Sequence, residues 1–306
     1  MRTKRIGMTA VLVLLTLTVF AYAAEAPVRI AFLDSGISTK HLDTAQVAAG
    51  ENFVFPSRDT DDRIGHGTAT AGIVLGSAEL GIKGVSPTAA AVPLVCYDQY
   101  PSGVSAPAGE ETLAAAIRAA VDRYDCRIIN ISMGVTEDSA ALREAVAYAE
   151  SKNAVIVSAV GNANRTNPER RYYPACYGTV IGAGAADGEQ AAAFSQRHGV
   201  DVVAPGVNLP TVTTRNAAKP EYRSGTSYAC AYVSGLCAEI VRQHPAYTAA
   251  EVRQALYAAA NDLGAPGYDA DTGWGLVTAP SYTAADLVRL SGVTAGVTAL
   301  YLGLAA

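Results

Sequence analysis

Three side chains with the chemistry of nucleophilic catalysis lie where the sequence predicts strands to end or helices to begin. Asp34 directly follows a short apolar run, His66 stands between two glycines, and Ser227 lies at the start of a long helical pattern. Each motif alone is also typical of an ordinary turn or helix cap. A serine hydroxyl, however, needs a base to take its proton, and an imidazole base needs a carboxylate to fix its tautomer. Together the three residues are therefore the parts of a nucleophilic triad.

Two further features of the sequence are suited to stabilise the negative charge that develops on the substrate oxygen during such a reaction. Asn162 follows another apolar run, and its side-chain amide can donate a hydrogen bond to an oxyanion. Ser227 lies in the first turn of its predicted helix, where backbone N–H groups have no partner within the helix. Asn162 is therefore a fourth candidate site residue.

Apolar runs that are typical of strands alternate with helical patterns along the chain. The predicted strands cover residues 28–33, 89–96, 126–131, 154–160, 179–182 and 200–204. The predicted helices cover residues 110–124, 139–152 and 226–243, and a further helix opens with a capping-box pattern at Thr248 and is closed by Gly264. Nearly continuous apolar strands between helices indicate a parallel sheet covered on both faces. We expect an α/β protein, three-layer α/β/α with a mainly parallel, doubly wound sheet, in one domain over residues 28–280.

Composition excludes several other classes of protein. Of the 306 residues, 50% are hydrophobic, which supports a packed core and excludes a disordered chain. The formal net charge of −5 argues against a nucleic-acid partner bound through broad basic charge. With 7% aromatic residues, a stacking platform for single strands is also disfavoured. We expect a monomer.

The two ends of the chain differ from the rest. Residues 1–23 join a basic start to a long uncharged stretch and end in Ala21-Tyr22-Ala23, which predicts a signal peptide and a secreted, periplasmic or extracellular protein. An uncleaved anchor is the alternative. Residues 281–306 are predicted to be a C-terminal tail that is loosely packed rather than a membrane anchor, so no stable membrane association is expected.

Export would allow disulfides among the five cysteines, but the sequence does not define a pairing. Cys230 and Cys237 lie seven residues apart on one predicted helix, about 10 Å along its axis, and cannot form a bridge with each other. The alternative is that several cysteines are small buried apolar residues. No C-x-x-C pattern occurs, which argues against zinc.

Motifs in a fixed order along the chain resemble those of the subtilisin-like (subtilase) serine proteases. The resemblance covers about residues 28–280, and the order Asp, His, Ser is that of subtilisin. The matching segments are Asp34-Ser35-Gly36, Gly65-His66-Gly67-Thr68, Ile129-Asn130-Ile131-Ser132-Met133-Gly134, Tyr173-Pro174-Ala175, Val203-Ala204-Pro205-Gly206, Ser224-Gly225-Thr226-Ser227 and Gly273-Trp274-Gly275-Leu276-Val277.

This resemblance implies a secreted serine endopeptidase that hydrolyses a polypeptide substrate through an acyl-enzyme. Ser227 would be the nucleophile, His66 the general base and acid, and Asp34 the residue that orients His66. Asn162 and the backbone N–H of Ser227 would form the oxyanion hole. Ser132-Met133-Gly134 would pair with the substrate backbone as an added strand and line the specificity pocket.

The resemblance implies no required cofactor, although a structural calcium ion is possible. Asp43 falls where a ligand of the family's calcium site often lies. Asp59, Asp61 and Asp62 form a separate acidic cluster that could hold a cation, although such a cluster is more often a solvated loop.

The chain departs from the family pattern in three places. Tyr228-Ala229-Cys230-Ala231-Tyr232 replaces the usual M-A-[ST]-P-H after the serine, and only residues 24–27 separate the predicted signal peptide from the catalytic domain, so no pro-domain is expected. These two departures support a second hypothesis, a pseudoprotease that binds peptides without cutting them. Tyr172 replaces a residue that is usually small and, if it lines the pocket, favours small substrate side chains.

Overall fold

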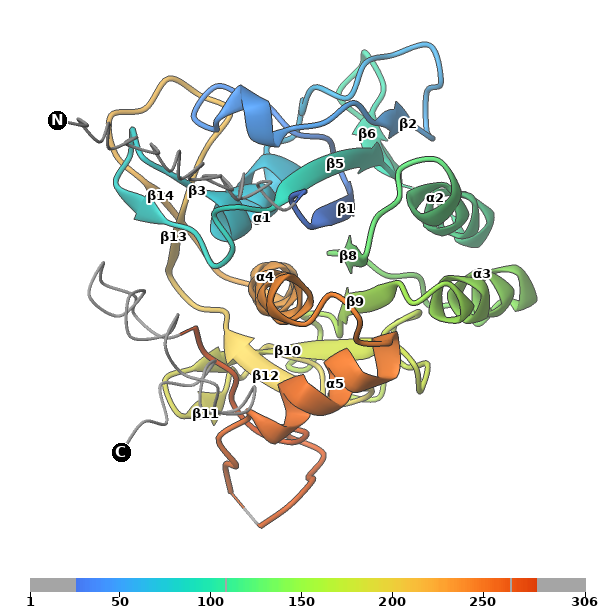
Figure 1. Ribbon diagram of the computed structural model, residues 1–306, viewed down its shortest axis with the longest axis vertical. Helices are drawn as coiled ribbons and strands as arrows, with labels where there is room; N and C mark the ends of the chain where they lie inside the picture. The colour runs from blue at the N-terminus through green and yellow to red at the C-terminus, as the bar shows by residue number, and fades with distance from the viewer. Residues whose placement is uncertain (1–25, 108, 265, 280–306) are drawn as a thin grey trace, which may run out of the picture.

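The computed structural model describes residues 26–107, 109–264 and 266–279 (Figure 1). The predicted signal peptide at residues 1–23 and the predicted tail at residues 281–306 lie outside the described residues, as do residues 24 and 25. Within the described part, no helix has the length and the apolar character that a membrane span requires.

A sheet of eight strands forms the centre of the molecule (Figure 1). Its path runs β11-β10-β9-β8-β1-β5-β2, and β12 pairs with β10. Every pairing in it is parallel except that of β10 with β11. The strands are β1 (Arg29–Asp34), β2 (Glu51–Asn52), β5 (Ala90–Val95), β8 (Ile128–Ile131), β9 (Val155–Ala159), β10 (Ile181–Asp187), β11 (Gln190–Ala191) and β12 (Val202–Pro205).

Successive residues of a strand point to opposite faces of the sheet. Both faces of this sheet are apolar, and helices cover each of them. Ile30 and Phe32 of β1 belong to a hydrophobic core with residues of three helices, α1 (His66–Leu75), α4 (Thr226–Gln243) and α5 (Ala249–Ala258). Ala31 and Leu33 belong to a second core with α2 (Glu110–Asp122) and α3 (Ala140–Ser151) (Figure 1). The two cores on opposite faces confirm the predicted three-layer α/β/α fold.

The helix that follows Pro245 begins as predicted but ends earlier. The Thr248 hydroxyl accepts a hydrogen bond from the Glu251 N–H at 3.2 Å, and the Glu251 carboxylate accepts one from the Thr248 N–H at 2.7 Å, so the capping box is confirmed. The prediction that Gly264 closes this helix is wrong, because α5 ends at Ala258. The chain turns away there so that the backbone of Asn261 can pair with that of Leu276.

Short elements outside the central layers were not predicted. They are the hairpins β3 (Gly76–Ser77)–β4 (Ile82–Lys83), β6 (Tyr97–Gln99)–β7 (Ser105–Pro107) and β13 (Leu209–Thr211)–β14 (Glu221–Arg223), and the 3-10 helix η1 (Thr44–Gln46). Strand β10 also extends beyond the predicted residues 179–182, although glycines interrupt its apolar pattern. These glycines allow close packing, since a Cβ on Gly182 would lie 1.6 Å from the carbonyl oxygen of Gly199.

The topology gathers the candidate site residues at one edge of the sheet. Asp34 is the last residue of β1, and Asn162 lies three residues beyond the end of β9. His66 and Ser227 lie in the first turns of α1 and α4. Because the carboxyl ends of parallel strands meet at the same edge, where open α/β sheets bind ligands, this is the part of the molecule in which a site is expected.

Candidate active site

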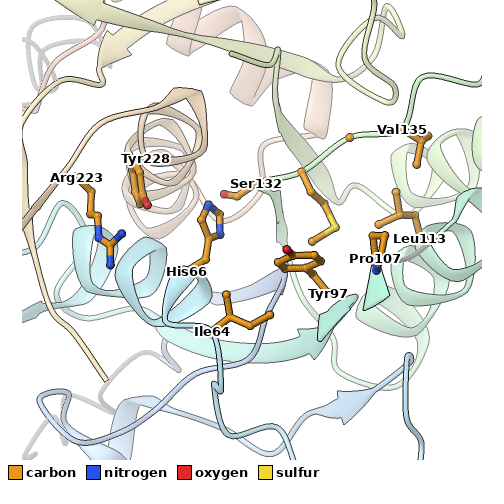
Figure 2. Close-up of a pocket in the computed structure, with 11 residues that line it drawn as sticks. Ile64, His66, Tyr97, Pro107, Leu113, Ser132, Val135, Arg223 and Tyr228 are labelled. Carbon is orange, nitrogen blue, oxygen red and sulfur yellow. The ribbon is translucent and has the colours of Figure 1, made fainter. Parts of the chain in front are cut away.

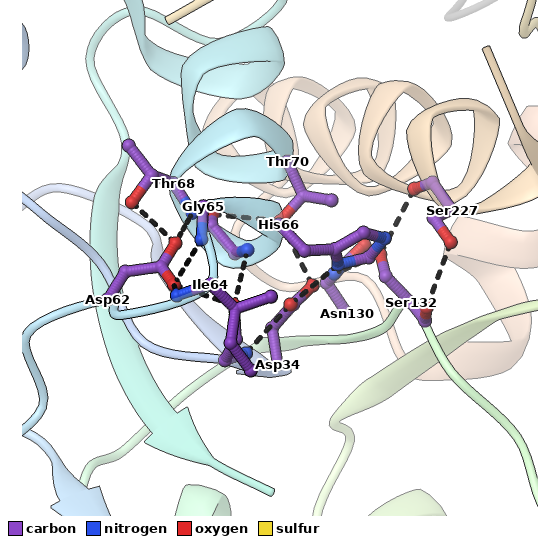
Figure 3. A network of polar contacts seen from close by, with 12 residues as sticks. Asp34, Asp62, Ile64, Gly65, His66, Thr68, Thr70, Asn130, Ser132 and Ser227 are labelled. Atoms are coloured by element: carbon purple, nitrogen blue, oxygen red, sulfur yellow. Dashed lines mark hydrogen bonds and ion pairs between the residues drawn. The ribbon is translucent and has the colours of Figure 1, made fainter. Parts of the chain in front are cut away.

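The predicted base, His66, is in direct contact with the aspartate that is predicted to orient it. His66 Nδ1 lies 2.7 Å from Asp34 Oδ1 (Figure 3). The Asp34 carboxylate is fully buried and also accepts hydrogen bonds from the Ser35 N–H at 2.7 Å and from the Thr70 hydroxyl at 3.2 Å. Three donors from two elements therefore hold the carboxylate in one orientation toward His66.

A second buried aspartate holds the N-terminus of α1, whose N-cap residue is a glycine without a side chain. Asp62 Oδ2 accepts the Thr68 N–H at 2.8 Å, and Asp62 Oδ1 accepts the Gly65 N–H at 2.7 Å and the Ser35 hydroxyl at 2.9 Å (Figure 3). The Ser35 oxygen in turn accepts the Gly67 N–H at 2.9 Å. The N–H groups of Gly65, Gly67 and Thr68 at this helix end are thus satisfied, and α1 is joined to the end of β1.

The glycine after His66 allows the helix to approach the aspartate strand. A Cβ on Gly67 would lie 2.2 Å from the carbonyl oxygen of Gly36 and 3.1 Å from Asp34 Cβ. No larger residue fits there without separating the two segments. The backbone of Gly36 therefore lies directly against the start of α1.

These contacts define the tautomer and the basicity of His66. Nδ1 faces a carboxylate, so it carries the proton, and Nε2 of the neutral ring keeps a lone pair that can accept one. Burial alone would lower the pKa of His66, but the charge of Asp34 and its hydrogen bond outweigh burial and raise the pKa above its ordinary value of 6.5. The imidazolium form is thus stabilised where a base would need it.

Ser227 lies beside His66, but its hydroxyl is directed to another partner. Ser227 Oγ donates to the carbonyl oxygen of Ser132 at 2.9 Å, and Ser132 Oγ donates to the carbonyl oxygen of Ser227 at 3.0 Å (Figure 3). Within the described residues, no hydrogen bond joins Ser227 Oγ to His66. To react with His66 as its base, Ser227 has to turn its hydroxyl away from Ser132 and toward the histidine.

Two donors beside Ser227 are left without a partner. Asn162 Oδ1 accepts the Thr226 N–H at 2.9 Å and the Thr226 hydroxyl at 3.1 Å, which fixes the orientation of its amide. In the part of the chain that the structure describes, neither Asn162 Nδ2 nor the Ser227 N–H has a hydrogen-bond partner. Both groups are therefore available to an oxygen atom at the start of α4.

A cavity of about 380 Å³ opens beside these donors. Ser132, Met133 and Gly134, predicted to bind substrate, line one part of it, together with Asn162 and Ser227.

Tyr172 also lines this cavity and reduces its size. Its ring lies against Gly161, where an added Cβ would approach Tyr172 Cε2 to 2.3 Å. The condition attached to the Tyr172 hypothesis, that the residue lines the pocket, is met.

A second cavity of about 460 Å³ extends on both sides of His66. Tyr97, Pro107, Leu113 and Val135 form an apolar part of its wall, and Arg223 and Tyr228 lie on the opposite side of His66 (Figure 2). The Tyr228 ring is buried, with its centroid 5.6 Å from that of His66. The hollow thus continues past the histidine in both directions.

The metal candidates do not come together. Asp43 caps η1 by accepting the Ala45 N–H at 2.9 Å, Asp59 pairs with Arg63, and Asp62 is used in the network described above. The described residues contain no group of three or more His, Cys, Asp or Glu side chains placed to hold a metal ion. The donor set around Asp43 therefore lacks the several carboxylates that a dedicated calcium site collects, and calcium binding stays a prediction.

The cysteines are all free thiols. Cys96, Cys126, Cys230 and Cys237 are buried, which agrees with the alternative that they act as small apolar residues. Burial raises the pKa of Cys126 and of Cys230 to about 12, so these thiols are not nucleophiles at neutral pH.

Sequence reasoning missed the positioning role of Asp62 and the presence of Arg223 and Tyr97 in the wall. Asp62 stands three residues before Gly65, a spacing typical of an aspartate that caps a turn, and this signal was available. Arg223 and Tyr97 lie on short hairpins that carry no periodic pattern, so nothing in the sequence predicted their place.

Comparison with known proteins agrees with this geometry. The family model described as the subtilase family matches residues 26–275. A thermostable alkaline protease from Halalkalibacterium halodurans is 33% identical over 241 residues, which is 78% of this chain and 63% of that protein. Subtilisin Savinase from Lederbergia lenta is 32% identical over 259 residues, 84% of this chain and 90% of that protein.

Solved structures give the same result. The S41 psychrophilic protease superposes with a TM-score of 0.72 at 29% identity, covering 82% of this chain and 91% of that one. Sphericase gives a TM-score of 0.71 at 27% identity, again covering 82% of this chain and 91% of that one. A central parallel sheet with an aspartate, a histidine and a serine at its carboxyl edge defines the class, and the chain belongs to the subtilase family. It spans less than two thirds of the first two curated relatives, 63% and 57% of their lengths.

Proposed function

We propose that the protein is a serine endopeptidase that hydrolyses peptide bonds in polypeptides through an acyl-enzyme on Ser227. The observation that carries this proposal is the 2.7 Å contact between Asp34 and His66, made next to Ser227 and two unpaired donors. A serine, an oriented base and a prepared oxyanion site are the complete set of groups for acyl transfer.

The reaction uses these groups in sequence. The Ser227 hydroxyl turns from the Ser132 carbonyl to His66 Nε2, which takes its proton as the oxygen attacks the substrate carbonyl. Asp34 stabilises the imidazolium that forms, and the oxyanion accepts hydrogen bonds from Asn162 Nδ2 and the Ser227 N–H. His66 then gives the proton to the amine as the C–N bond breaks. Water next attacks the acyl-enzyme, His66 takes its proton, and this proton returns to Ser227 Oγ as the ester bond breaks and the acid is released.

Substrate recognition would involve the segment that ends at the site. We propose that Ser132-Met133-Gly134 pairs with the extended substrate backbone, as an added strand, and directs one side chain into the cavity of about 380 Å³. Tyr172 restricts that cavity to small side chains.

The second hypothesis, a pseudoprotease, rests on the changed segment after Ser227. In the structure, α4 is continuous from Thr226 to Gln243, and Tyr228 packs beside His66; among the residues that the structure describes, no hydrogen bond occupies His66 Nε2. The changed segment therefore leaves the candidate triad accessible, so this arrangement is compatible with the active enzyme and gives the binding protein no specific support.

Labelling with a fluorophosphonate probe tests the proposal, because only an activated serine reacts with it at an appreciable rate. Peptide mass mapping should place the label on Ser227, and His66→Ala should abolish it. His244→Ala is the matched control, since this histidine stacks on Tyr247 and is not among the residues that line the site. A folded wild-type protein without label at Ser227 would favour the pseudoprotease.

We also propose that residues 1–23 direct export and are removed. The support is the basic start, the uncharged stretch and the small residues Ala21 and Ala23. Mass spectrometry of the exported protein should find Ala24 as its first residue, and an intact N-terminus on membrane-bound protein would support the uncleaved anchor.

A further inference from the structure

Arg223 is a charged group in the active-site wall that the proposed reaction does not use. It ends β14 and lines the cavity of about 460 Å³ together with His66 and Tyr228. Figure 2 shows Arg223 and Tyr228 on one side of His66 and Tyr97, Pro107 and Val135 on the other.

The Arg223 guanidinium has more hydrogen-bond donors than it has protein acceptors within the described residues. Its Nη2 lies 2.9 Å from Glu221 Oε1, and both side chains are about one third exposed, at 37% and 34%. Its Nε is buried and has no hydrogen-bond partner in the described part of the chain. An arginine presents five N–H donors, and within the described residues the partly exposed Arg223 guanidinium is paired only with Glu221, so its remaining accessible donors are suited to a ligand with acceptor oxygens.

The direction in which the substrate chain crosses the site shows which part of it lies beside Arg223. The acyl part of the substrate is assigned to Ser132-Met133-Gly134, which continues toward Val135 on the apolar side of His66. A chain that passes Ser227 must then leave toward the other side, where Arg223 and Tyr228 lie (Figure 2). The leaving group of the reaction is therefore the part of the substrate nearest to Arg223.

We propose that Arg223 selects substrates that carry a carboxylate on the leaving-group side of the cleaved bond. This inference rests on the proposed endopeptidase function. A carboxylate fits an arginine fork through paired hydrogen bonds, whereas an ammonium group there would be repelled. The carboxylate can belong to an aspartate or glutamate side chain, or to the C-terminus of a short substrate.

Arg223 also acts on the base. Its positive charge lowers the pKa of His66, against the larger effect of Asp34. A substrate carboxylate beside Arg223 would offset this charge while His66 is protonated, so the same contact supports binding and proton transfer.

Peptides that differ only in the residue after the cleaved bond test the proposal. With amidated C-termini and Asp, Asn or Lys at that position, kcat/KM for Asp should exceed that for Asn by about five- to tenfold, with Lys lowest. A matching pair with Ala in the position, as free acid or amide, distinguishes a terminal carboxylate from a side chain. High salt should reduce either preference.

Variants assign the preference to one residue. Arg223→Gln should bring the Asp-to-Asn ratio close to 1 and move the acid limb of kcat/KM to higher pH, whereas Arg223→Lys should keep part of the ratio. Glu221→Gln should increase it by removing the competing carboxylate. Arg215→Gln is the matched control, because Arg215 is a cation in the same loop region that does not line the cavity, and it should keep the wild-type ratio.

The outcomes separate the two proposals. If fluorophosphonate labels Ser227 but all leaving-group residues give equal rates, only the role of Arg223 is overturned. A preference that survives in Arg223→Gln has the same consequence. An unlabelled Ser227 in folded protein would overturn the endopeptidase function on which it rests.

Discussion

The two halves of the site are built in opposite ways. On the histidine side, Asp34 and Asp62 are buried and accept hydrogen bonds from neighbouring backbone and hydroxyl groups. On the serine side, the Ser227 hydroxyl has a partner that it must leave, and two donors have none within the described residues. The first half is satisfied before substrate arrives, and the second half is not.

This difference follows from what each half does. A base has to be fixed in one tautomer and one direction, so its supporting groups are best saturated with protein hydrogen bonds. Oxyanion donors have to be unpaired until charge develops, because a donor already bonded to the protein gives nothing to the transition state. Substitutions on the two sides should therefore have different effects on activity and stability.

Ser227→Ala should have the largest effect, since it removes the proposed nucleophile. We expect kcat/KM to fall by at least about 10⁴-fold with the fold unchanged. Peptide hydrolysis and circular dichroism of purified protein check both parts. Wild-type-like activity in this variant would show that another residue is the nucleophile.

Asp34→Asn should reduce kcat by about 10⁴-fold, because the amide can present a donor to His66 Nδ1 and favour the wrong tautomer. Single-turnover kinetics on a peptide substrate measure this loss. Thr70→Val, which removes only one hydrogen bond to the same carboxylate, is the matched control and should cost far less. Equal losses in both variants would mean that Asp34 acts through general packing.

The pH dependence of activity is a second test of the effect of Asp34 on His66. The free base must be neutral to accept a proton, so kcat/KM should rise as pH rises through the pKa of His66, and this limb should be centred above 6.5. Burial opposes the shift and the Asp34 carboxylate causes it, so the residual activity of Asp34→Asn should have its limb at lower pH. A limb that stays in place would assign the titration to another group.

The candidate residues of both halves could be predicted from the sequence, but the hydrogen bonds that orient them could not. Asp34, His66 and Gly67 lie at the ends of long regular elements, and short apolar runs and glycines indicate such ends. The parallel direction of β1, β5 and β8 follows from the pattern of buried strands separated by helices.

Other features depend on tertiary contacts that have no local pattern. The Ser227 hydroxyl binds the carbonyl of Ser132, which is 95 residues away in sequence, and no spacing rule predicts it. Arg223 lies on a three-residue strand, β14, which is too short to show a periodic pattern in the sequence. Gly182 of β10 has the appearance of a strand breaker in the sequence, but glycine is required there because the backbone of Gly199 approaches it.

Asn162→Ala should lower kcat by about 100- to 1,000-fold with little change in KM, a range known for loss of the equivalent donor in the relative subtilisin rather than calculated from this geometry. Steady-state kinetics separate the two constants. Thr226→Val removes one of the two hydrogen bonds that orient Asn162 and the acceptor of the Gly161 N–H but leaves Asn162 Nδ2 in place, so it should lower kcat less than Asn162→Ala does. A loss confined to KM would exclude the oxyanion role.

Asp62→Asn should affect stability more than chemistry. One of its oxygens would become a donor facing the hydroxyl and N–H donors of Thr68, Gly65 or Ser35, so we expect the free energy of unfolding to fall by about 2–3 kcal/mol. Urea unfolding measures this, and kcat below the transition should fall by about tenfold at most. Asp61→Asn, an exposed neighbour, should change neither quantity. A large loss of kcat at unchanged stability would place Asp62 in the chemistry itself.

Tyr172→Ala should have the smallest effect on the reaction and a clear effect on substrate choice. The Tyr172 ring occupies the space over Gly161, so its removal enlarges the cavity beside Ser227. We expect kcat/KM for a substrate with Phe before the cleaved bond to rise about tenfold relative to one with Ala, since each added apolar contact contributes modestly. Tyr222→Ala is the matched control, because Tyr222 is 64% exposed and does not line this cavity. If both variants keep the wild-type Phe-to-Ala ratio, the size of the pocket is set by another part of its wall, and Ser132-Met133-Gly134 would be the segment to vary next.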